Sequence, residues 1–410
     1  MTAPPPLSGL RVFDLTRILA GPTCTQILGD LGADVIKVER AGAGDDTRKF
    51  GPPWLKDAQG QDTGESAYYL SANRNKRSLT LDLAKPEGQM LARKLLAQCD
   101  VLVENFKVGD LSKYGLAYDQ IKDEFPSLIY CSITGFGQTG PYAPRAGYDY
   151  LAQGIGGIMS LTGQPEGTPG AEPLKVGLAV ADITTGLYAT IAILSALRHR
   201  DATGKGQMLD LALLDTQVSW LFNEGLNYLV SGQVPKRLGN AHPNIVPYQA
   251  FKSADGYITL AVGNDSQFRK FCEFAGCAEL AADPRFATNP GRVRNREALI
   301  PQLREIIAAK PRDHWLTGLE KAGVPCGPVN TLDQVFADPQ VIARGMRIDL
   351  PHGRHDVKVP SIANPMKMSE TPPTYRLAPP LCGEHTDQVL RELLSMNDGE
   401  IAALRERGIV

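Results

Sequence analysis

The chain has 410 residues, of which 43% are hydrophobic and 21% charged, the composition of a globular protein long enough for two domains. The formal net charge is −2 and no long basic run occurs, so we expect neither nucleic acid nor another polyanion as a partner. No apolar run reaches the roughly 18 residues of a membrane span, so we expect no membrane partner either.

Seven cysteines are scattered along the chain, an odd number without any CxxC pair. This pattern favours free thiols in a reducing compartment and predicts no zinc site. The N-terminus lacks a basic segment followed by an apolar core, so we expect no signal peptide. These observations predict a cytoplasmic protein that holds no metal.

The first 40 residues show a strand, helix, strand pattern. Apolar residues predict strands at 10–15 and 34–39, with a helix from Pro22 to near Gly32 between them. The intervening turn is not GxGxxG, which disfavours a dinucleotide. Arg40 follows the second strand, where an arginine can accommodate a phosphorylated ribose, although a solvated surface arginine fits the pattern equally well.

The same alternation continues to Ala212 and predicts an α/β fold built on a doubly wound, Rossmann-like parallel sheet of about six strands. Residues 41–65 form a long loop, and the basic cluster 73–77 is either a solvated turn or a phosphate contact. Polar residues at strand ends fall where open sheets of this kind bind ligands. The remaining predicted strands cover 78–83, 100–104, 128–133 and 208–213.

Asp182 stands where an apolar run enters a long apolar helix pattern. As an N-cap, it would accept hydrogen bonds from the first free N–H groups of that helix. As a functional carboxylate, it would be stabilised in its charged form at the positive end of the helix and could act as a nucleophile or base. Spacing alone does not decide between these interpretations.

The sequence pattern changes after Ser231. We predict a large domain formed by residues 1–225 and completed by a C-terminal return segment, 331–410, which is too thin for a core of its own. Residues 226–330 are predicted to form a smaller α+β domain.

Several motifs together resemble the family III CoA-transferases of the CaiB/BaiF type. They include Leu10-Arg-Val-Phe-Asp-Leu-Thr, Gly32-Ala-Asp-Val-Ile-Lys-Val-Glu-Arg40, Val103-Glu-Asn-Phe106, Ala181-Asp182 and Leu381-Cys-Gly-Glu-His-Thr386. Gly44-Asp-Asp-Thr-Arg48 and Ile245-Val-Pro-Tyr-Gln-Ala-Phe251 place the chain nearest to the succinyl-CoA:glutarate group. The resemblance covers almost the whole length.

The resemblance implies a CoA-transferase in which Asp182 is the nucleophile, with Tyr148 and Asp149 as a catalytic pair beside it. Acyl-CoA is then a substrate, CoA moves to a carboxylic acid such as glutarate, and the enzyme passes through an aspartyl anhydride and an aspartyl-CoA thioester. Water must be excluded from such intermediates. The resemblance also implies an interlocked homodimer.

The same resemblance assigns binding residues. Leu19, Arg48, Asn240 and His242 fall on the acid side, and a far carboxylate would need a cation such as Arg17, Arg48, Arg74 or His242. The CoA contacts would be Arg17, Ala20, Arg40, Leu81, Ala84, Asn105, Phe106, Lys107, Lys113, Arg145, Ala146 and Gly147.

Two other functions stay open. The α-methylacyl-CoA racemases share this fold but carry a Gly-His-Asp motif, where this chain has Gly147-Tyr148-Asp149. A tyrosine with its usual pKa of about 10 is a poor base at neutral pH, which disfavours proton abstraction. A non-catalytic CoA-binding protein would be expected to lack the nucleophile, which is present here as Asp182.

Overall fold

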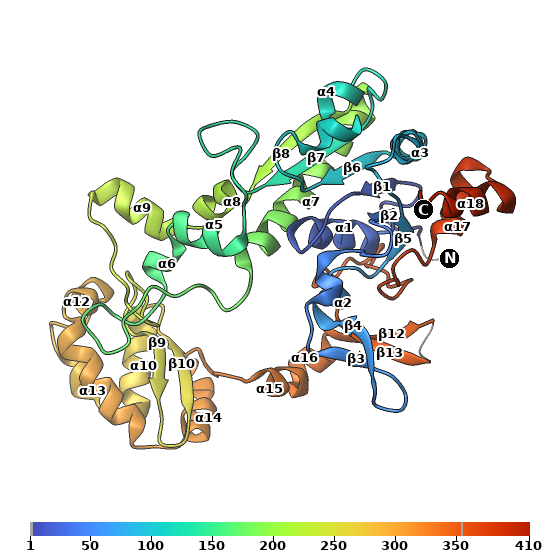
Figure 1. The fold of residues 1–410 in the computed structure, drawn as a ribbon. Helices are drawn as coiled ribbons and strands as arrows, with labels where there is room; N and C mark the ends of the chain where they lie inside the picture. Colours follow the sequence, from blue (N-terminus) through green and yellow to red (C-terminus); the bar gives the residue numbers. More distant parts are fainter. Residues whose placement is uncertain (1–2, 354–355) are drawn as a thin grey trace. The chain divides into compact units, whose positions relative to one another are not determined.

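A computed structural model describes residues 3–353 and 356–410 (Figure 1). The chain divides into two compact units. The first unit comprises residues 1–158, 175–226 and 340–410, and the second comprises 159–174 and 227–339. Segments 159–174 and 331–339, which the sequence pattern assigns to the large domain, lie in the second unit.

A six-stranded parallel sheet forms the centre of the first unit, in the order β5-β2-β1-β6-β7-β8. The order reverses between β1 and β6, so the chain leaves the two central strands in opposite directions across the sheet. This is the doubly wound sheet that the alternating pattern predicted. Its strands are β1 (Arg11–Asp14), β2 (Asp34–Glu39), β5 (Lys76–Thr80), β6 (Val101–Glu104), β7 (Ile129–Thr134) and β8 (Gln207–Ala212).

Apolar side chains alternate along these strands and build two cores, one on each face of the sheet. In β1, Val12 enters one core and Phe13 the other, and Val35 and Ile36 of β2 divide in the same way. Helices α1 and α7 cover the Val12 face, and α3, α17 and α18 cover the Phe13 face (Figure 1). Their bounds are α1 (Ala20–Asp30), α3 (Pro86–Leu96), α7 (Val180–Thr203), α17 (Thr386–Leu394) and α18 (Asp398–Glu406).

Helix α7 is long and apolar enough to cross a membrane, with 24 residues and a mean hydropathy of 1.6 over its best 18-residue window. Asp182 and several polar residues interrupt its sequence, so it contains no uninterrupted apolar run of that length. Half of that window is buried within the protein, and Ala189 and Ile193 pack into the core behind the sheet. The helix is therefore accounted for as a core helix of the first unit.

The remaining elements of the first unit are short. Two antiparallel hairpins, β3–β4 and β12–β13, lie in segments that the sequence pattern left as a loop and a proline-rich tail. Their bounds, with those of the neighbouring helices, are η1 (Asp46–Lys49), β3 (Trp54–Lys56), β4 (Asp62–Ser66), α2 (Ala67–Ser71), η2 (Asp110–Tyr114), α4 (Tyr118–Ile121), α5 (Asp149–Ile155), α8 (Leu213–Ser219), β12 (Arg347–His352) and β13 (Val357–Ile362).

The second unit has a core of its own around Phe268, Phe271 and Trp315. An antiparallel sheet in the order β11-β10-β9 packs against helices. Its elements are β9 (Tyr248–Lys252), β10 (Tyr257–Ala261), α10 (Asp265–Ala275), α11 (Ala278–Ala282), α12 (Asn289–Arg294), α13 (Arg296–Ala308), α14 (Arg312–Ala322), β11 (Cys326–Pro328) and α15 (Leu332–Ala337). Helices α6 (Ile158–Leu161), α9 (Phe222–Ser231) and α16 (Pro339–Ala343) stand where the chain passes between the units.

Candidate active site

The loops that follow β1, β6 and β7 enclose a cavity of about 440 Å³ in the first unit. Two of these strands flank the point where the strand order reverses, which is where doubly wound sheets bind ligands. Asp182, at the start of α7, lines the same cavity. The other lining residues that the sequence had singled out are Arg17, Leu19, Ala20, Asn105, Phe106, Lys107, Arg145, Ala146, Gly147, Tyr148 and Asp149.

Asp182 is not the N-cap of its helix. Ala179 holds that position, and its side chain caps nothing. Asp149 takes over the capping from a distant part of the chain, because its Oδ1 accepts hydrogen bonds from the N–H groups of Ala181 at 2.8 Å and Asp182 at 3.3 Å. Gln153 fixes Asp149 in turn by donating to its Oδ2 at 2.7 Å. The carboxylate of Asp182 has no hydrogen-bond partner among the described residues, so it is free to meet a substrate.

A contact between two glycines brings Tyr148 and Asp149 to this position. The backbones of Gly135, after β7, and Gly147 cross so closely that a Cβ on Gly135 would lie 2.3 Å from the Cα of Gly147. Any side chain at either position would push the two segments apart. Glycine is therefore required at residue 147 to seat the segment that caps α7, independently of any role in proton transfer.

Burial raises the pKa of Asp182 to about 7, and the negative charge of Asp149 adds to the effect. Among the residues that the structure describes, no cation offsets the loss of water around this carboxylate, so its charged form is disfavoured. A carboxylate held in this way is more reactive toward an electrophile than a solvated one.

We expect the rate of acyl exchange to fall at acid pH as Asp182 becomes protonated. Because only the ionised form attacks, kcat/KM for the CoA donor should decrease about tenfold per pH unit below a pKa near 7. Steady-state rates between pH 5.5 and 9 measure this acid limb of the pH profile. Asp149→Asn should shift it to lower pH while leaving it well above 3.8, because burial is the larger cause. A flat profile down to pH 5.5 would contradict the assignment.

A second cavity of about 390 Å³ adjoins the ends of β2 and β5. Arg17, Phe106 and Asp110 line both cavities, so the two cavities adjoin there, and we call this place the passage. An elongated ligand could therefore reach from Arg40 in the second cavity to Asp182 in the first. Of the predicted CoA contacts, Arg40, Leu81 and Ala84 line this second cavity alone, and Arg17 and Phe106 line it together with the first.

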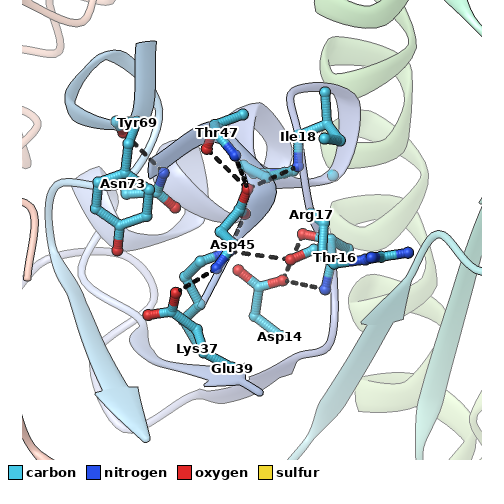
Figure 2. Close-up of polar contacts among 12 residues, drawn as sticks. Asp14, Thr16, Arg17, Ile18, Lys37, Glu39, Asp45, Thr47, Tyr69 and Asn73 are labelled. Atoms are coloured by element: carbon cyan, nitrogen blue, oxygen red, sulfur yellow. Dashed lines mark hydrogen bonds and ion pairs between the residues drawn. The ribbon is translucent and has the colours of Figure 1, made fainter. Parts of the chain in front are cut away.

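Residues 16–18, the segment that follows β1, are held in place by buried charges (Figure 2). Lys37, which is fully buried, donates to the carbonyl of Thr16 at 3.0 Å and pairs with Asp45 at 2.8 Å. Asp45 also accepts from the N–H of Ile18 at 3.3 Å. Asn105 fixes the residue between them, since its amide accepts from the N–H of Arg17 and donates to the carbonyl of Arg17. We call residues 16–18 the ledge.

Ile18 has a φ of 70°, which is unfavourable for a β-branched residue. Such strain persists only where the surroundings impose it, and it gathers at functional sites. Both neighbours of Ile18 also line the first cavity, so the network of Lys37 and Asp45 sets the shape of one wall of the site.

Other predicted residues do not face either cavity. Lys113 is exposed and pairs with Asp110 at 2.9 Å. Arg48, expected on the acid side, binds Glu39 through two nitrogens at 2.8 and 2.7 Å and also donates to Tyr69, so it is a structural residue. Asn240 and His242 belong to the second unit.

The basic cluster 73–77 is neither a solvated turn nor a phosphate contact. Arg74 and Asn75 donate to Asp30, and Arg77 pairs with Asp34. Lys76 is fully buried and pairs with Asp14 at 3.2 Å. These charges lie in the interior, where carboxylates from other elements neutralise them.

Several lining residues escaped the sequence analysis. Ile18 and Leu213 carry no chemistry that a motif would mark, and Asp46 and Asp110 stand in segments read only as loop. The signal for Asp46 was its place in the Gly44-Asp-Asp motif. No group of three His, Cys, Asp or Glu side chains suited to a metal occurs in the part of the chain that the structure describes.

A reversed sheet order, two adjoining cavities and an unpartnered carboxylate suit an enzyme that acts on an elongated substrate, and the chain belongs to CoA-transferase family III, whose model matches residues 7–386. It is 50% identical to the succinate–glutarate CoA-transferase of Agrobacterium fabrum, over 95% of this chain and 96% of that protein. It is 45% identical to the human succinyl-CoA:glutarate CoA-transferase, over 99% of this chain and 90% of that one. A CaiB/BaiF family protein from Brucella suis has a similar crystal structure, with a TM-score of 0.84, 52% identity and coverage of 95% of this chain and 100% of that chain.

Proposed function

We propose that this enzyme transfers CoA from succinyl-CoA to a short dicarboxylate such as glutarate, with Asp182 as the nucleophile. The observation that carries the proposal is the carboxylate of Asp182, which stands free in a cavity with its pKa raised to about 7. The substrates follow from the relatives, two of which are named for succinate or succinyl-CoA together with glutarate.

The reaction proceeds in four exchanges. The carboxylate of Asp182 attacks the thioester carbonyl of succinyl-CoA, the C–S bond breaks, and CoA leaves as a thiolate. The thiolate then attacks the aspartyl carbonyl of the mixed anhydride, releasing succinate and leaving an aspartyl-CoA thioester. Glutarate attacks this thioester and expels the thiolate again, which leaves a mixed anhydride of Asp182 and glutarate. The thiolate then attacks the glutaryl carbonyl of this anhydride, which forms glutaryl-CoA and frees the carboxylate of Asp182. Each step conserves an activated acyl bond, so no other energy source is needed.

Each group around Asp182 has a part in this sequence. Asp149 holds the first turn of α7 and keeps the carboxylate of Asp182 facing the cavity. Its negative charge also disfavours a second anion nearby, which favours turning the carboxylate of Asp182 into a neutral acyl group. Tyr148 is 68% exposed and lines the cavity, where its ring would cover the bound acyl group and exclude water.

CoA binding is proposed along the two cavities. Arg40 would meet the phosphorylated ribose in the second cavity, and Phe106 would contact the chain of CoA in the passage. Lys107 and Arg145, which line the first cavity, supply positive charge on the opposite side. The guanidinium of Arg145 lies 4.5 Å from the centre of the Tyr142 ring, a geometry that orients it.

We propose that the chain works as a homodimer. Helices α7, α8 and α9 expose large apolar side chains, including Ile191 at 58% and Phe222 at 78%. Apolar surface of this kind marks an interface in a globular protein. Light scattering of the purified enzyme should give a mass of two chains, and a mass of one chain would refute the proposal.

The test of the proposed function incubates the enzyme with succinyl-CoA and a panel of acids (glutarate, malate, itaconate, carnitine and oxalate) and identifies the acyl-CoA products by mass. Glutaryl-CoA should form fastest. If no acid accepts CoA, the proposal fails. Deuterium uptake at the acyl α-carbon without any acceptor would favour the racemase reaction instead.

A further inference from the structure

A short dicarboxylate presents a second negative charge a few carbons from its reacting carboxylate. Inside a cavity this far carboxylate is costly unless a cation binds it, and a guanidinium suits it best because its planar fork matches two carboxylate oxygens. This reasoning rests on the proposed function. The sequence offered four candidates for the cation: Arg17, Arg48, Arg74 and His242.

The structure removes two of the four. The guanidinium of Arg48 is engaged by Glu39, by Tyr69 and by the carbonyl of Pro380. Arg74 is only 6% exposed and binds Asp30 through two nitrogens at 2.9 and 2.6 Å. Neither residue lines the cavity that holds Asp182.

His242 belongs to the second unit, whereas every residue that lines this cavity belongs to the first. Its Nδ1 accepts a hydrogen bond from the N–H of Asn244 at 3.1 Å, within the second unit. This nitrogen is therefore engaged by the backbone and does not donate to a carboxylate.

Arg17 lines the cavity of Asp182, and its side chain is 45% exposed. Among residues 3–353 and 356–410, the one carboxylate that pairs with it is Asp46, which contacts a single nitrogen, Nη1, at 3.0 Å. The remaining N–H groups of the guanidinium are available to a ligand. The ring of Phe106 lies 5.6 Å from the guanidinium carbon and limits where the side chain can go.

The ledge presents this side chain from a fixed backbone (Figure 2). Both backbone polar groups of Arg17 are bound by Asn105, at 2.9 and 2.7 Å. On either side, Lys37 binds the carbonyl of Thr16 and Asp45 binds the N–H of Ile18. Buried charges and the strained backbone of Ile18 thus fix the backbone of Arg17. Strain of this kind gathers at functional sites, which supports a functional role for the Arg17 side chain.

Lys107 and Arg145 also bring positive charge to this cavity. Lys107 is an exposed ammonium, which binds as a point charge and does not select a planar carboxylate. Arg145 lies against two rings, with its guanidinium 5.2 Å from the centre of Phe136 and 4.5 Å from that of Tyr142. Arg17 differs from Arg145 because a carboxylate that lines the same cavity, that of Asp46, already orients its guanidinium.

We propose that Arg17 is the specificity-determining residue that binds the far carboxylate of both the donor's acyl group and the acceptor acid. The succinyl group and the acceptor are attached to Asp182 in turn, so their far carboxylates occupy the same place. One cation then selects dicarboxylates at both ends of the reaction. Asp46 holds the guanidinium in position between turnovers.

The test compares Arg17→Gln with the wild-type enzyme on glutarate and on valerate, which has a methyl group in place of the far carboxylate. We expect kcat/KM for glutarate to fall about 100-fold and the glutarate-to-valerate ratio to fall by a similar factor, while the dissociation constant for free CoA rises by much less, under tenfold, because Arg17 only borders the second cavity. Arg17→Lys should recover part of the glutarate rate, because it keeps the charge but not the fork.

Two controls make the result decisive. Arg40→Gln should weaken CoA binding and leave the glutarate-to-valerate ratio unchanged, and Arg304→Gln, on the exposed face of α13, should change neither. The inference is overturned if Arg17→Gln weakens CoA tenfold or more, or if it leaves the glutarate-to-valerate ratio unchanged. If the wild-type enzyme itself exchanges no dicarboxylate, the proposed function fails. If the wild-type enzyme does so and Arg17→Gln keeps the preference for glutarate over valerate, only the inference about Arg17 fails.

Discussion

Asp182→Asn should abolish CoA transfer, with a fall in kcat of at least about 10³-fold, while the protein still folds and binds CoA. The amide cannot attack a thioester, and the neighbouring carboxylate of Asp149 cannot replace it. Asp149 is occupied by the N–H groups of Ala181 and Asp182 and by the amide of Gln153. Exchange of labelled succinate into succinyl-CoA measures the loss, and calorimetry with free CoA measures the binding that remains.

The same substitution should stabilise the protein. Because the folded-state pKa of Asp182 is raised from 3.8 to about 7, the charged carboxylate destabilises the fold at high pH, and this penalty disappears as the pH falls toward 4. Asp182→Asn removes the penalty, so it should raise the free energy of unfolding by about 2 kcal/mol at pH 8 and by almost nothing at pH 4. This value is roughly half of what the full shift would give at about 1.4 kcal/mol per pKa unit, since the side chain is partly solvated.

Thermal unfolding of the wild type and the variant at the two pH values separates these effects. Asp149→Asn is the matched control, because it also removes a negative charge from the cavity but leaves the nucleophile in place. It should keep measurable exchange. An Asp182→Asn enzyme with normal turnover, or trapping with hydroxylamine that labels a different side chain, would overturn the assignment.

The parallel sheet could be predicted from the sequence because its strands are buried on both faces and read as short apolar runs. Val101–Glu104 is an example, and the structure begins and ends that strand within one residue of the expected range. Most of the residues predicted for the site line one cavity with Asp182. Their selection depended on motif resemblance, since the pattern alone also allowed an N-cap at Asp182, and the structure gives the capping role to Asp149, 33 residues earlier in the chain.

What the sequence could not reveal depends on partners that are distant along the chain. The cluster 73–77 looks like a solvated turn until Asp30, Asp34 and Asp14 are brought against it by folding. The positive φ of Ile18 has no local signal either, because glycine or asparagine would be the usual residue there. In both cases the tertiary network overrides the local preference.

Breaking the buried pair of Lys37 and Asp45 should destabilise the fold strongly. Both side chains are fully buried, with the ammonium 2.8 Å from the carboxylate. Asp45→Asn would leave the charge of Lys37 without its direct partner, and we expect a loss of about 3–5 kcal/mol in the free energy of unfolding. Urea unfolding at pH 7 measures it. A loss below about 1 kcal/mol would show that the pair does not hold the ledge.

The control is a double-mutant cycle with Lys37→Met. Removing both charges together should cost less than the sum of the two single losses by at least about 1 kcal/mol, because no unpaired charge then remains buried.

Unfolding at acid pH provides an independent test. The pKa of Asp45 is lowered to about 2, chiefly by the ammonium of Lys37 against the opposing effect of burial, so the stability that the pair contributes is complete above pH 4 and lost as the pH falls through about 2. This acid-dependent loss should be absent in Asp45→Asn, and since Asp45 binds the N–H of Ile18, the variant should also lose exchange activity under conditions where it remains folded.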